Sequence, residues 1–329
     1  MRSSGPIDLE PRFLLQMAHL TTPATVWKYV EGACTKSAAS LVMLDLEDSI
    51  PAGDDAALAT GRANVVRAFR DLDWGHRLRF FRPRGRELDP DLEDVRVIVS
   101  ACGDRIDGLV YPKVEDVDDV RRLDRTLDAL DRSGRIKIEI LIESVSGEEQ
   151  AFEIAAASRR LAGLVYGAFD WWSSLGMVGE RYRPDHPLVD HARARIVKAA
   201  ASAGVPAIAE MTLNYPTKDK SPAEQEAALH ECRRDAEHAR AFGFRGKWTG
   251  IPAQTAIALE VFTLPDAVID AAVEDAKLYA AALREGRGAT MIKGRMADRA
   301  TDRVNRVILA TAFAMGRLDP AIARELGLA

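Results

Sequence analysis

The chain has 329 residues, of which 47% are hydrophobic and 29% charged, and these values fit one large α/β barrel or two ordinary globular domains. A formal net charge of −5 argues against a surface that binds nucleic acid, and no apolar run approaches the roughly 20 residues of a membrane span. Three widely spaced cysteines and a polar start without a signal-peptide pattern predict a reduced, cytoplasmic protein.

Eight short apolar segments alternate with helix-like segments in the first part of the chain. The predicted strands are FLLQMAH (13–19), LVMLDLED (41–48), RLRFFRPR (77–84), GLVYPKV (108–114), IKIEILIES (136–144), LAGLVYGAFD (161–170), VPAIAEMTL (205–213) and FRGKWTGIP (244–252). Strand–helix alternation favours a parallel sheet, and eight such units in about 250 residues predict a closed (β/α)₈ TIM barrel. A doubly wound open sheet is the alternative, but no GxGxxG motif follows the first strand.

The last part of the chain has a different pattern. One helix is predicted to end near Gly286, the Gly-punctuated loop GRGATMIKGRMAD follows, and RATDRVNRVILATAFAMGRL predicts another helix. We therefore predict a TIM-barrel catalytic domain over residues 1–263 and a C-terminal helix–lid–helix extension over residues 264–329. The extension is too small for a core of its own and should pack on the barrel or on a neighbouring subunit.

Charged residues follow several predicted strands at the end where barrel enzymes place their active sites. They are Asp45, Glu47 and Asp48; Arg82 and Arg84; Lys113 and Glu115; Glu143; and Asp170. Glu143 and Asp170 lie at matching ends of consecutive strands, and oxygen ligands without a nearby His or Cys suit a hard cation such as Mg²⁺. A structural ring, in which the acids only pair with the basic residues, fits the residues equally well.

The alternation of a strand predicts where the acids after the second strand point. Asp45 and Glu47 are two residues apart and should share the face toward the barrel mouth, where they can accept hydrogen bonds from metal-bound water or from Arg82. Asp48 should point the other way and cap the next loop.

Other polar residues near the mouth have open or structural interpretations. Arg84 fits two roles equally, contact with a substrate carboxylate or neutralisation of Glu47. Lys113 and Glu115 are expected to pair locally, and Trp171–Trp172 to pack in the interior.

The order of the motifs resembles that of the citrate lyase beta-subunit-like lyases of the HpcH/HpaI aldolase/citrate lyase family, most closely the malyl-CoA lyases. The matching stretches are LDLEDSI (44–50), DLDWG (71–75), GDRIDGLVYPKVED (103–116), IEILIESVSGEEQAFEIAAASRRL (138–161), YGAFDWWSSLGM (166–177), GFRGKW (243–248) and GRGATMIKGRMAD (286–298). The resemblance implies a (β/α)₈ barrel that assembles as a homotrimer or homohexamer. It also implies Mg²⁺ (or Mn²⁺) held by Glu143 and Asp170.

The resemblance further implies a reaction. A β-hydroxyacyl-CoA of the malyl-, methylmalyl- or citramalyl-CoA type would be cleaved reversibly into a 2-oxo acid, such as glyoxylate or pyruvate, and an enolate. Arg82 would stabilise the enolate, with Asp45 and Glu47 supporting the catalytic site. Asp298, on a lid donated by an adjacent subunit, would act as general acid–base, and Lys28 would bind coenzyme A.

Several positions differ from the family pattern. The Gly-Pro-Gly turn expected after the first strand is replaced by the stretch from Gln16 to His19, and an arginine near it by Thr22; His19, at that strand's end, is not expected to contact substrate. Arg-Ile-Asn-Gly becomes Arg82–Gly85 (RPRG), and Ile-His-Pro becomes Gly250–Pro252 (GIP). Two alternatives therefore stay open, an aldolase acting on free 2-oxo-hydroxy acids without coenzyme A and a malyl-CoA thioesterase.

Overall fold

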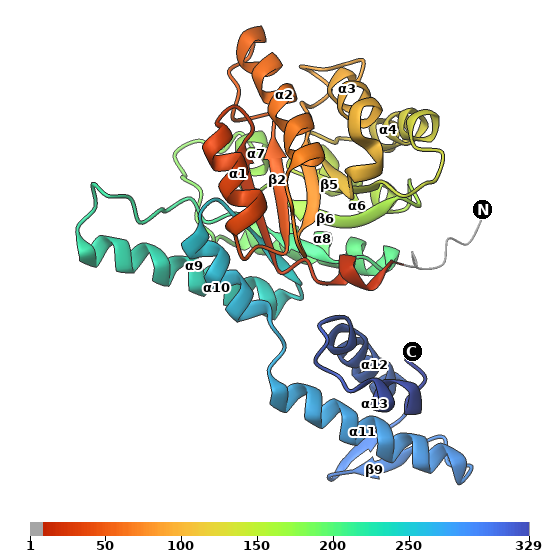
Figure 1. Cartoon of the computed structure of the whole chain (residues 1–329). Helices are drawn as coiled ribbons and strands as arrows, with labels where there is room; N and C mark the ends of the chain where they lie inside the picture. The colour runs from red at the N-terminus through yellow and green to blue at the C-terminus, as the bar shows by residue number, and fades with distance from the viewer. Residues whose placement is uncertain (1–8, 329) are drawn as a thin grey trace. The chain divides into compact units, whose positions relative to one another are not determined.

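The computed structural model describes residues 9–328, and its main feature is a closed barrel of eight parallel strands in sequence order (Figure 1). The strands are β1 (Ala18–Pro23), β2 (Leu41–Asp45), β3 (Leu78–Arg82), β4 (Gly108–Tyr111), β5 (Lys137–Ile142), β6 (Leu161–Tyr166), β7 (Ala207–Ala209) and β8 (Gly246–Thr249). The predicted (β/α)₈ barrel is therefore confirmed, and the open sheet is excluded because β1 pairs with both β2 and β8.

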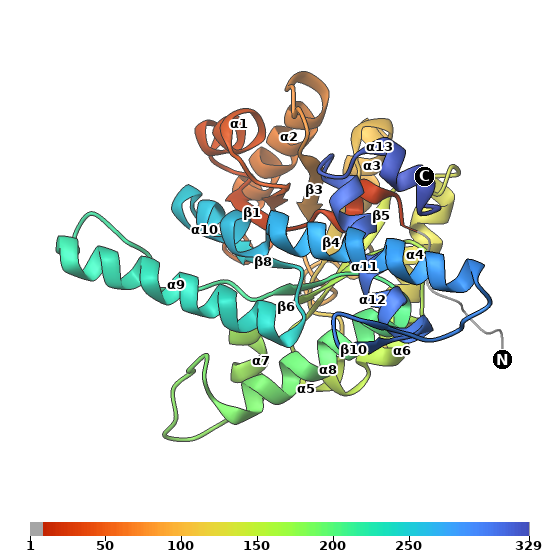
Figure 2. The same cartoon turned by 90° about the horizontal axis from the view of Figure 1, so that it is seen from below.

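Helices surround these strands (Figure 2). They are α1 (Trp27–Lys36), α2 (Asp55–Asp71), α3 (Glu93–Cys102), α4 (Val117–Leu130), α5 (Val145–Glu149), α6 (Ala151–Ala155), α7 (Ala168–Ser174), α8 (Pro187–Ala203), α9 (Pro222–Phe242) and α10 (Pro252–Phe262), with the 3₁₀ helix η2 at Gly103–Arg105. Alternate strand residues such as Val42 and Leu44 are fully buried in the core between strands and helices. The intervening residues face the barrel interior, so the strands read as continuous apolar runs.

The predicted position of the first strand is wrong. The apolar run at 13–19 is split between the 3₁₀ helix η1 (Pro11–Leu14) and the start of β1 (Ala18–Pro23). The run FLL resembles a strand, whereas Thr21–Pro23 resembles a loop because proline cannot donate to a ladder. Pro23 is tolerated here as the last residue of β1. His19 therefore lies at the beginning of β1, and not at the end near the mouth.

A second compact unit comprises the chain from Thr263 onward together with Glu10–Leu15. It contains α11 (Asp266–Arg284), β9 (Thr290–Ile292), β10 (Arg295–Ala297), α12 (Arg299–Ala314) and α13 (Pro320–Glu325). The Gly-punctuated loop predicted here contains an antiparallel hairpin, because Lys293 and Gly294 both have positive φ and form its tight turn. No helix in the described part of the chain is long and apolar enough to cross a membrane.

Candidate active site

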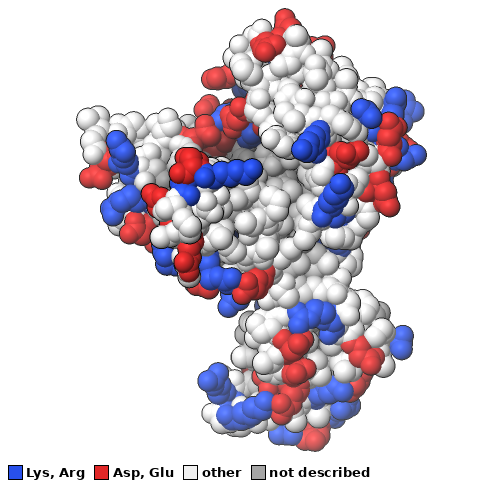
Figure 3. Space-filling view, turned by 60° about the vertical axis from the view of Figure 1, so that its left-hand side comes forward, with Lys and Arg blue, Asp and Glu red and all other residues white. Residues whose placement is uncertain are grey.

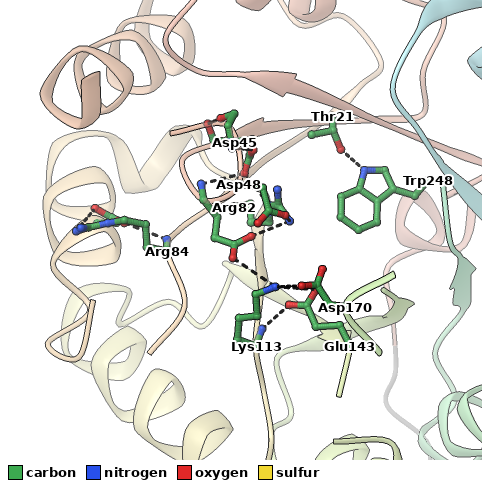
Figure 4. A network of polar contacts seen from close by, with 12 residues as sticks. Thr21, Asp45, Asp48, Arg82, Arg84, Lys113, Glu143, Asp170 and Trp248 are labelled. Atoms are coloured by element: carbon green, nitrogen blue, oxygen red, sulfur yellow. Dashed lines mark hydrogen bonds and ion pairs between the residues drawn. The ribbon is translucent and has the colours of Figure 1, made fainter. Parts of the chain in front are cut away.

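Arg82 is buried at the centre of an ion-pair network at the carboxyl ends of β2 and β3 (Figure 4). It is the register partner of Asp45 on the neighbouring strand, and its Nε donates to Asp45 Oδ1 at 2.6 Å. Its Nη1 lies 2.9 Å from Glu47 Oε2 and 3.1 Å from Asp48 Oδ2. The expectation that Asp48 points away is wrong, because β2 ends at Asp45 and the alternation of a strand no longer applies beyond it.

Asp45 is fixed by its own backbone as well as by Arg82. Its two carboxylate oxygens accept the backbone N–H groups of Glu47 and Ser49, each at 3.0 Å. Burial alone would raise the pKa of Asp45, but the Arg82 guanidinium and these donors hold the pKa below its ordinary value. Asp45 is therefore an ionised group that orients Arg82.

Arg82 is only 2% exposed, and its guanidinium carbon lies 5.3 Å from the ring centroid of Trp248 on β8. The indole N–H of Trp248 donates to Thr21 Oγ1 on β1. Burial opposes the charge of Arg82, but Asp45, Glu47 and Asp48 keep its pKa above the ordinary value. The guanidinium thus stays charged and is held in one orientation from three sides.

Lys113 joins Arg82's network to the two predicted metal ligands. Its Nζ donates to Asp170 Oδ1 at 2.6 Å and lies 3.7 Å from both Glu143 Oε2 and Glu47 Oε1. Its backbone N–H also donates to Glu143 Oε1 at 2.7 Å. The predicted local pairing of Lys113 with Glu115 is therefore wrong. The side chain instead places a positive charge between the two carboxylates.

The absence of a side chain at Gly167 leaves the space that the Glu143 side chain fills. A Cβ at Gly167, on the neighbouring strand end, would lie 2.5 Å from the Cβ of Glu143 and 2.9 Å from its Oε2. Gly85 provides similar space for Lys113, since a Cβ there would lie 2.9 Å from Lys113 Cγ. Lys113 itself has φ of 54°, a left-handed conformation that is uncommon outside glycine and is frequent at functional sites.

The network carries an excess of negative charge. Among the described residues, these contacts join five carboxylates, Asp45, Glu47, Asp48, Glu143 and Asp170, to the two cations Arg82 and Lys113. Burial raises the pKa of Glu143 to about 8 despite the opposing charge of Lys113. Burial likewise raises the pKa of Glu47 to about 7, although Arg82 opposes the shift.

This charge distribution fits a divalent cation. Glu143 and Asp170 converge on the ammonium of Lys113, so a positive charge already occupies the space between them. No cluster of three or more His, Cys, Asp or Glu side chains suited to a metal is found among residues 9–328. A site with two carboxylates suits Mg²⁺, which commonly keeps water and substrate oxygens as its other ligands.

The remaining predictions near the mouth have mixed outcomes. Arg84 does not neutralise Glu47; its Nε donates to Asp94 Oδ2 at 2.9 Å and its backbone N–H to the same oxygen at 3.0 Å. The packing role of the two tryptophans is confirmed. Trp171 lies edge-to-face with Tyr166, and Trp172 with Tyr182.

A groove of about 800 Å³ borders the barrel between α1 and α10. Its polar residues include Lys28 and Lys36 on α1, and much of its lining consists of Leu20, Pro23, Ala33, Ile251, Pro252 and Ala256. In Figure 3 the barrel unit shows a broad uncharged surface with charged side chains at its margins. Lys28 thus borders a largely apolar groove that also contacts the end of β1.

Asp298 belongs to the second compact unit, where it caps the N-terminus of α12. Its Oδ1 accepts the backbone N–H groups of Ala300 and Thr301 at 2.9 and 3.1 Å. These donors, that of Thr301 above all, lower the pKa of Asp298 below its ordinary value. The carboxylate is therefore ionised at neutral pH.

A closed parallel barrel with buried charges at the carboxyl ends of its strands defines the architecture of a TIM-barrel enzyme. The profile of the HpcH/HpaI aldolase/citrate lyase family matches residues 27–250, which include every barrel residue of the network. The chain belongs to this family, and it is a carbon–carbon lyase of the citrate lyase beta-subunit-like type.

Individual relatives agree with this assignment. The chain is 36% identical to the L-malyl-CoA/beta-methylmalyl-CoA lyase of Cereibacter sphaeroides over 84% of this chain and 88% of the relative. It is 31% identical to the malyl-CoA/beta-methylmalyl-CoA/citramalyl-CoA lyase of Chloroflexus aurantiacus, over 86% and 84%. The fold is similar to that of protein CitE from Mycobacterium tuberculosis, crystallised with magnesium, acetoacetate and coenzyme A, with a TM-score of 0.62 and 23% identity over 96% and 98%.

Gly167→Ala should displace Glu143, because the added methyl group would overlap its side chain. We expect at least about a tenfold loss of Mn²⁺ or Mg²⁺ affinity by titration calorimetry, the scale reported for disturbed supporting groups of metal sites. Gly103→Ala is the matched control, since its Cβ would meet only Val99 and Ile136 at ordinary contact distances. Equal metal affinity in the two variants would contradict the assigned position of the site.

Proposed function

We propose that this protein is a Mg²⁺-dependent lyase that cleaves or forms a β-hydroxyacyl-CoA of the malyl-, methylmalyl- or citramalyl-CoA type through an enolate. The observation that carries the proposal is the joint placement of Glu143, Asp170 and Arg82 in one ion-pair network, joined through Glu47 and Lys113, at the carboxyl ends of the strands. The names of the relatives that are more than 30% identical support the same substrate class.

The proposed metal ligands are Glu143 and Asp170. A bound divalent cation would supply Lewis-acid stabilisation for negative charge on the oxygen of a 2-oxo acid. Lys113 would have to withdraw from between the carboxylates when the cation binds. Its single hydrogen bond to Asp170 and its side chain, which is 33% exposed, allow that movement.

Arg82 is the proposed stabiliser of the enolate. Asp45 holds the guanidinium through Nε, and Glu47 and Asp48 hold it through Nη1; Nη2 is the proposed donor to the enolate oxygen. A fixed guanidinium needs no reorganisation as charge develops in the transition state, which is the basis of electrostatic catalysis. Asp45 and Glu47 are proposed to act through Arg82 by holding it in place.

Asp298 is the proposed acid–base group. In the condensation direction its ionised carboxylate would take a proton from the acyl carbon next to the thioester, and the resulting enolate would attack the carbonyl carbon of the 2-oxo acid. In cleavage the same proton returns to that carbon. We propose that an adjacent subunit of a homotrimer or homohexamer supplies Asp298; exposed Met291, Met296 and Val304 in the second unit support an interface there.

The groove between α1 and α10 is the proposed site for coenzyme A. Lys28 would pair with a phosphate group of coenzyme A, and the apolar lining of the groove would contact the rest of the coenzyme A molecule. This favours a thioester substrate over a free 2-oxo-hydroxy acid.

The decisive assay combines the protein and Mg²⁺ with glyoxylate or pyruvate and acetyl- or propionyl-CoA, with product masses as readout. Release of pyruvate from hydroxy-oxo acids without condensation of any thioester would overturn the proposal.

Arg82→Lys should lower kcat by about 10²–10³-fold, because a lysine keeps the charge but lacks the planar, oriented N–H donors of the guanidinium. The KM of the 2-oxo acid should change little, since the effect falls on the transition state. Arg84→Lys is the matched control, because Arg84 pairs with Asp94 outside the network. The proposal predicts steady-state kinetics near the wild type for the control, and a similar loss of kcat in both variants would sink the assignment.

Lys28→Ala should raise the KM of the acyl-CoA by about tenfold or more, which corresponds to the loss of one charge-assisted hydrogen bond. The KM of glyoxylate or pyruvate should not change. Lys198→Ala, in an exposed position of α8, provides the control. An unchanged KM for the thioester would show that this end of the groove does not bind coenzyme A.

Glu143→Gln and Asp298→Asn should each be inactive alone but active when mixed after reversible dissociation. If each site takes these residues from two subunits, random mixing of equal amounts leaves about a quarter of the sites intact. Activity should therefore recover to about a quarter of the wild-type value, measured per subunit. A mixture that stays inactive would place both residues in one subunit's site.

A further inference from the structure

A second polar cluster lies inside the barrel, at the opposite end from the mouth. It consists of Gln16 just before β1, His19 on β1 and Glu139 on β5, which are 0%, 1% and 0% exposed. His19 Nδ1 lies 3.4 Å from Glu139 Oε2, and Gln16 Nε2 donates to the carbonyl oxygen of Ala162 at 3.0 Å. Gly163 on β6 faces Glu139; a Cβ there would lie 3.4 Å from its Oε1.

The cluster has few hydrogen bonds for so many polar atoms. Both oxygens of Glu139, Nε2 of His19 and Oε1 of Gln16 are buried without a hydrogen-bond partner. Glu139 is four residues before Glu143, so the charges of the mouth lie about 13 Å further along the strand. A carboxylate in this position would be a buried charge without adequate compensation, which is among the most costly arrangements in a protein.

The groups that face Glu139 do not supply that compensation. Gln16 is an amide, Gly163 has no side chain, and a charged His19 would itself require solvation that the interior does not offer. Burial raises the pKa of Glu139 well above its ordinary value, although the Gln16 amide acts in the opposite direction. Burial also lowers the pKa of His19 to about 3. Both results agree with an uncharged pair.

We propose that Glu139 is a protonated carboxylic acid in the folded protein and forms, with neutral His19, a dyad that holds a single proton between β1 and β5 and makes the fold less stable as the solution becomes alkaline. The proton resides on a Glu139 oxygen, and Nδ1 of His19 faces it as an acceptor. Glu139 lies on the same face of its strand as Glu143, and His19 on the same face as Thr21. The dyad therefore links the two strands that carry Glu143 and Thr21.

The sign of the pH effect follows from linkage. Unfolding exposes Glu139, which then loses its proton above its ordinary pKa of 4.5, so stability is lost as pH rises above this value toward the folded-state pKa. In that window the unfolding equilibrium constant gains about tenfold per pH unit from this proton. His19 acts in the opposite sense, because stability is lost as pH falls from its ordinary 6.5 toward about 3.

Proton release on thermal unfolding tests the proposal. At pH 7.5, calorimetry in buffers of different ionisation enthalpy should find that the wild type releases about one proton more than Glu139→Gln. Glu139→Met, which is of similar length and also cannot ionise, replaces the glutamine variant if that variant does not fold. Equal proton release by the wild type and these variants would overturn the proposal, since Glu139 would then be ionised in the folded state.

Glu210→Gln is the matched control. Glu210 is also buried, but Arg193 pairs with it, and its pKa stays below the ordinary value despite burial. It is ionised in both states at pH 7.5, so its removal should leave proton release unchanged.

At pH 5, His19→Asn should take up about one proton less on unfolding than the wild type. Equal uptake by His19→Asn and the wild type would mean that His19 is charged in the folded protein, which contradicts the dyad.

Discussion

The candidate site depends on the burial of Arg82 among three carboxylates. Arg82 is only 2% exposed, and its charge is tolerated there because Asp45, Glu47 and Asp48 compensate it. The compensation exceeds what Arg82 needs, and the remaining negative charge extends through Glu47 and Lys113 to Glu143 and Asp170. The same excess that orients the arginine thus leaves negative charge on the neighbouring carboxylates, which the proposed cation would neutralise.

The barrel supplies this arrangement through strand register. Asp45 and Arg82 are paired positions at the last residues of β2 and β3, so their side chains meet on the interior face without any long loop. Gly167 and Gly85 leave the space that Glu143 and Lys113 fill. The network is therefore preorganised on rigid strand ends, whereas the group proposed for proton transfer, Asp298, belongs to the other compact unit.

The sequence predicted the barrel and most of the strands, because short apolar runs and strand–helix alternation are local signals. It misplaced β1, since the run FLL resembles a strand and Thr21–Pro23 does not. It also missed the partners of Lys113, Arg84 and Asp48. Lys113 has a left-handed backbone, Arg84 pairs with Asp94 on α3, and Asp48 lies beyond the end of β2. These contacts depend on loop conformation, which spacing along the chain does not encode.

The central claim is that Glu143 and Asp170 hold a divalent cation in place of the Lys113 ammonium. Anomalous X-ray scattering from crystals soaked in Mn²⁺ tests this most directly, because it locates the ion and the lysine in one experiment. The account predicts an anomalous peak within bonding distance of both carboxylates, with Lys113 Nζ moved away from Asp170. A peak elsewhere, or a lysine that still bridges the two acids at saturating Mn²⁺, would contradict it.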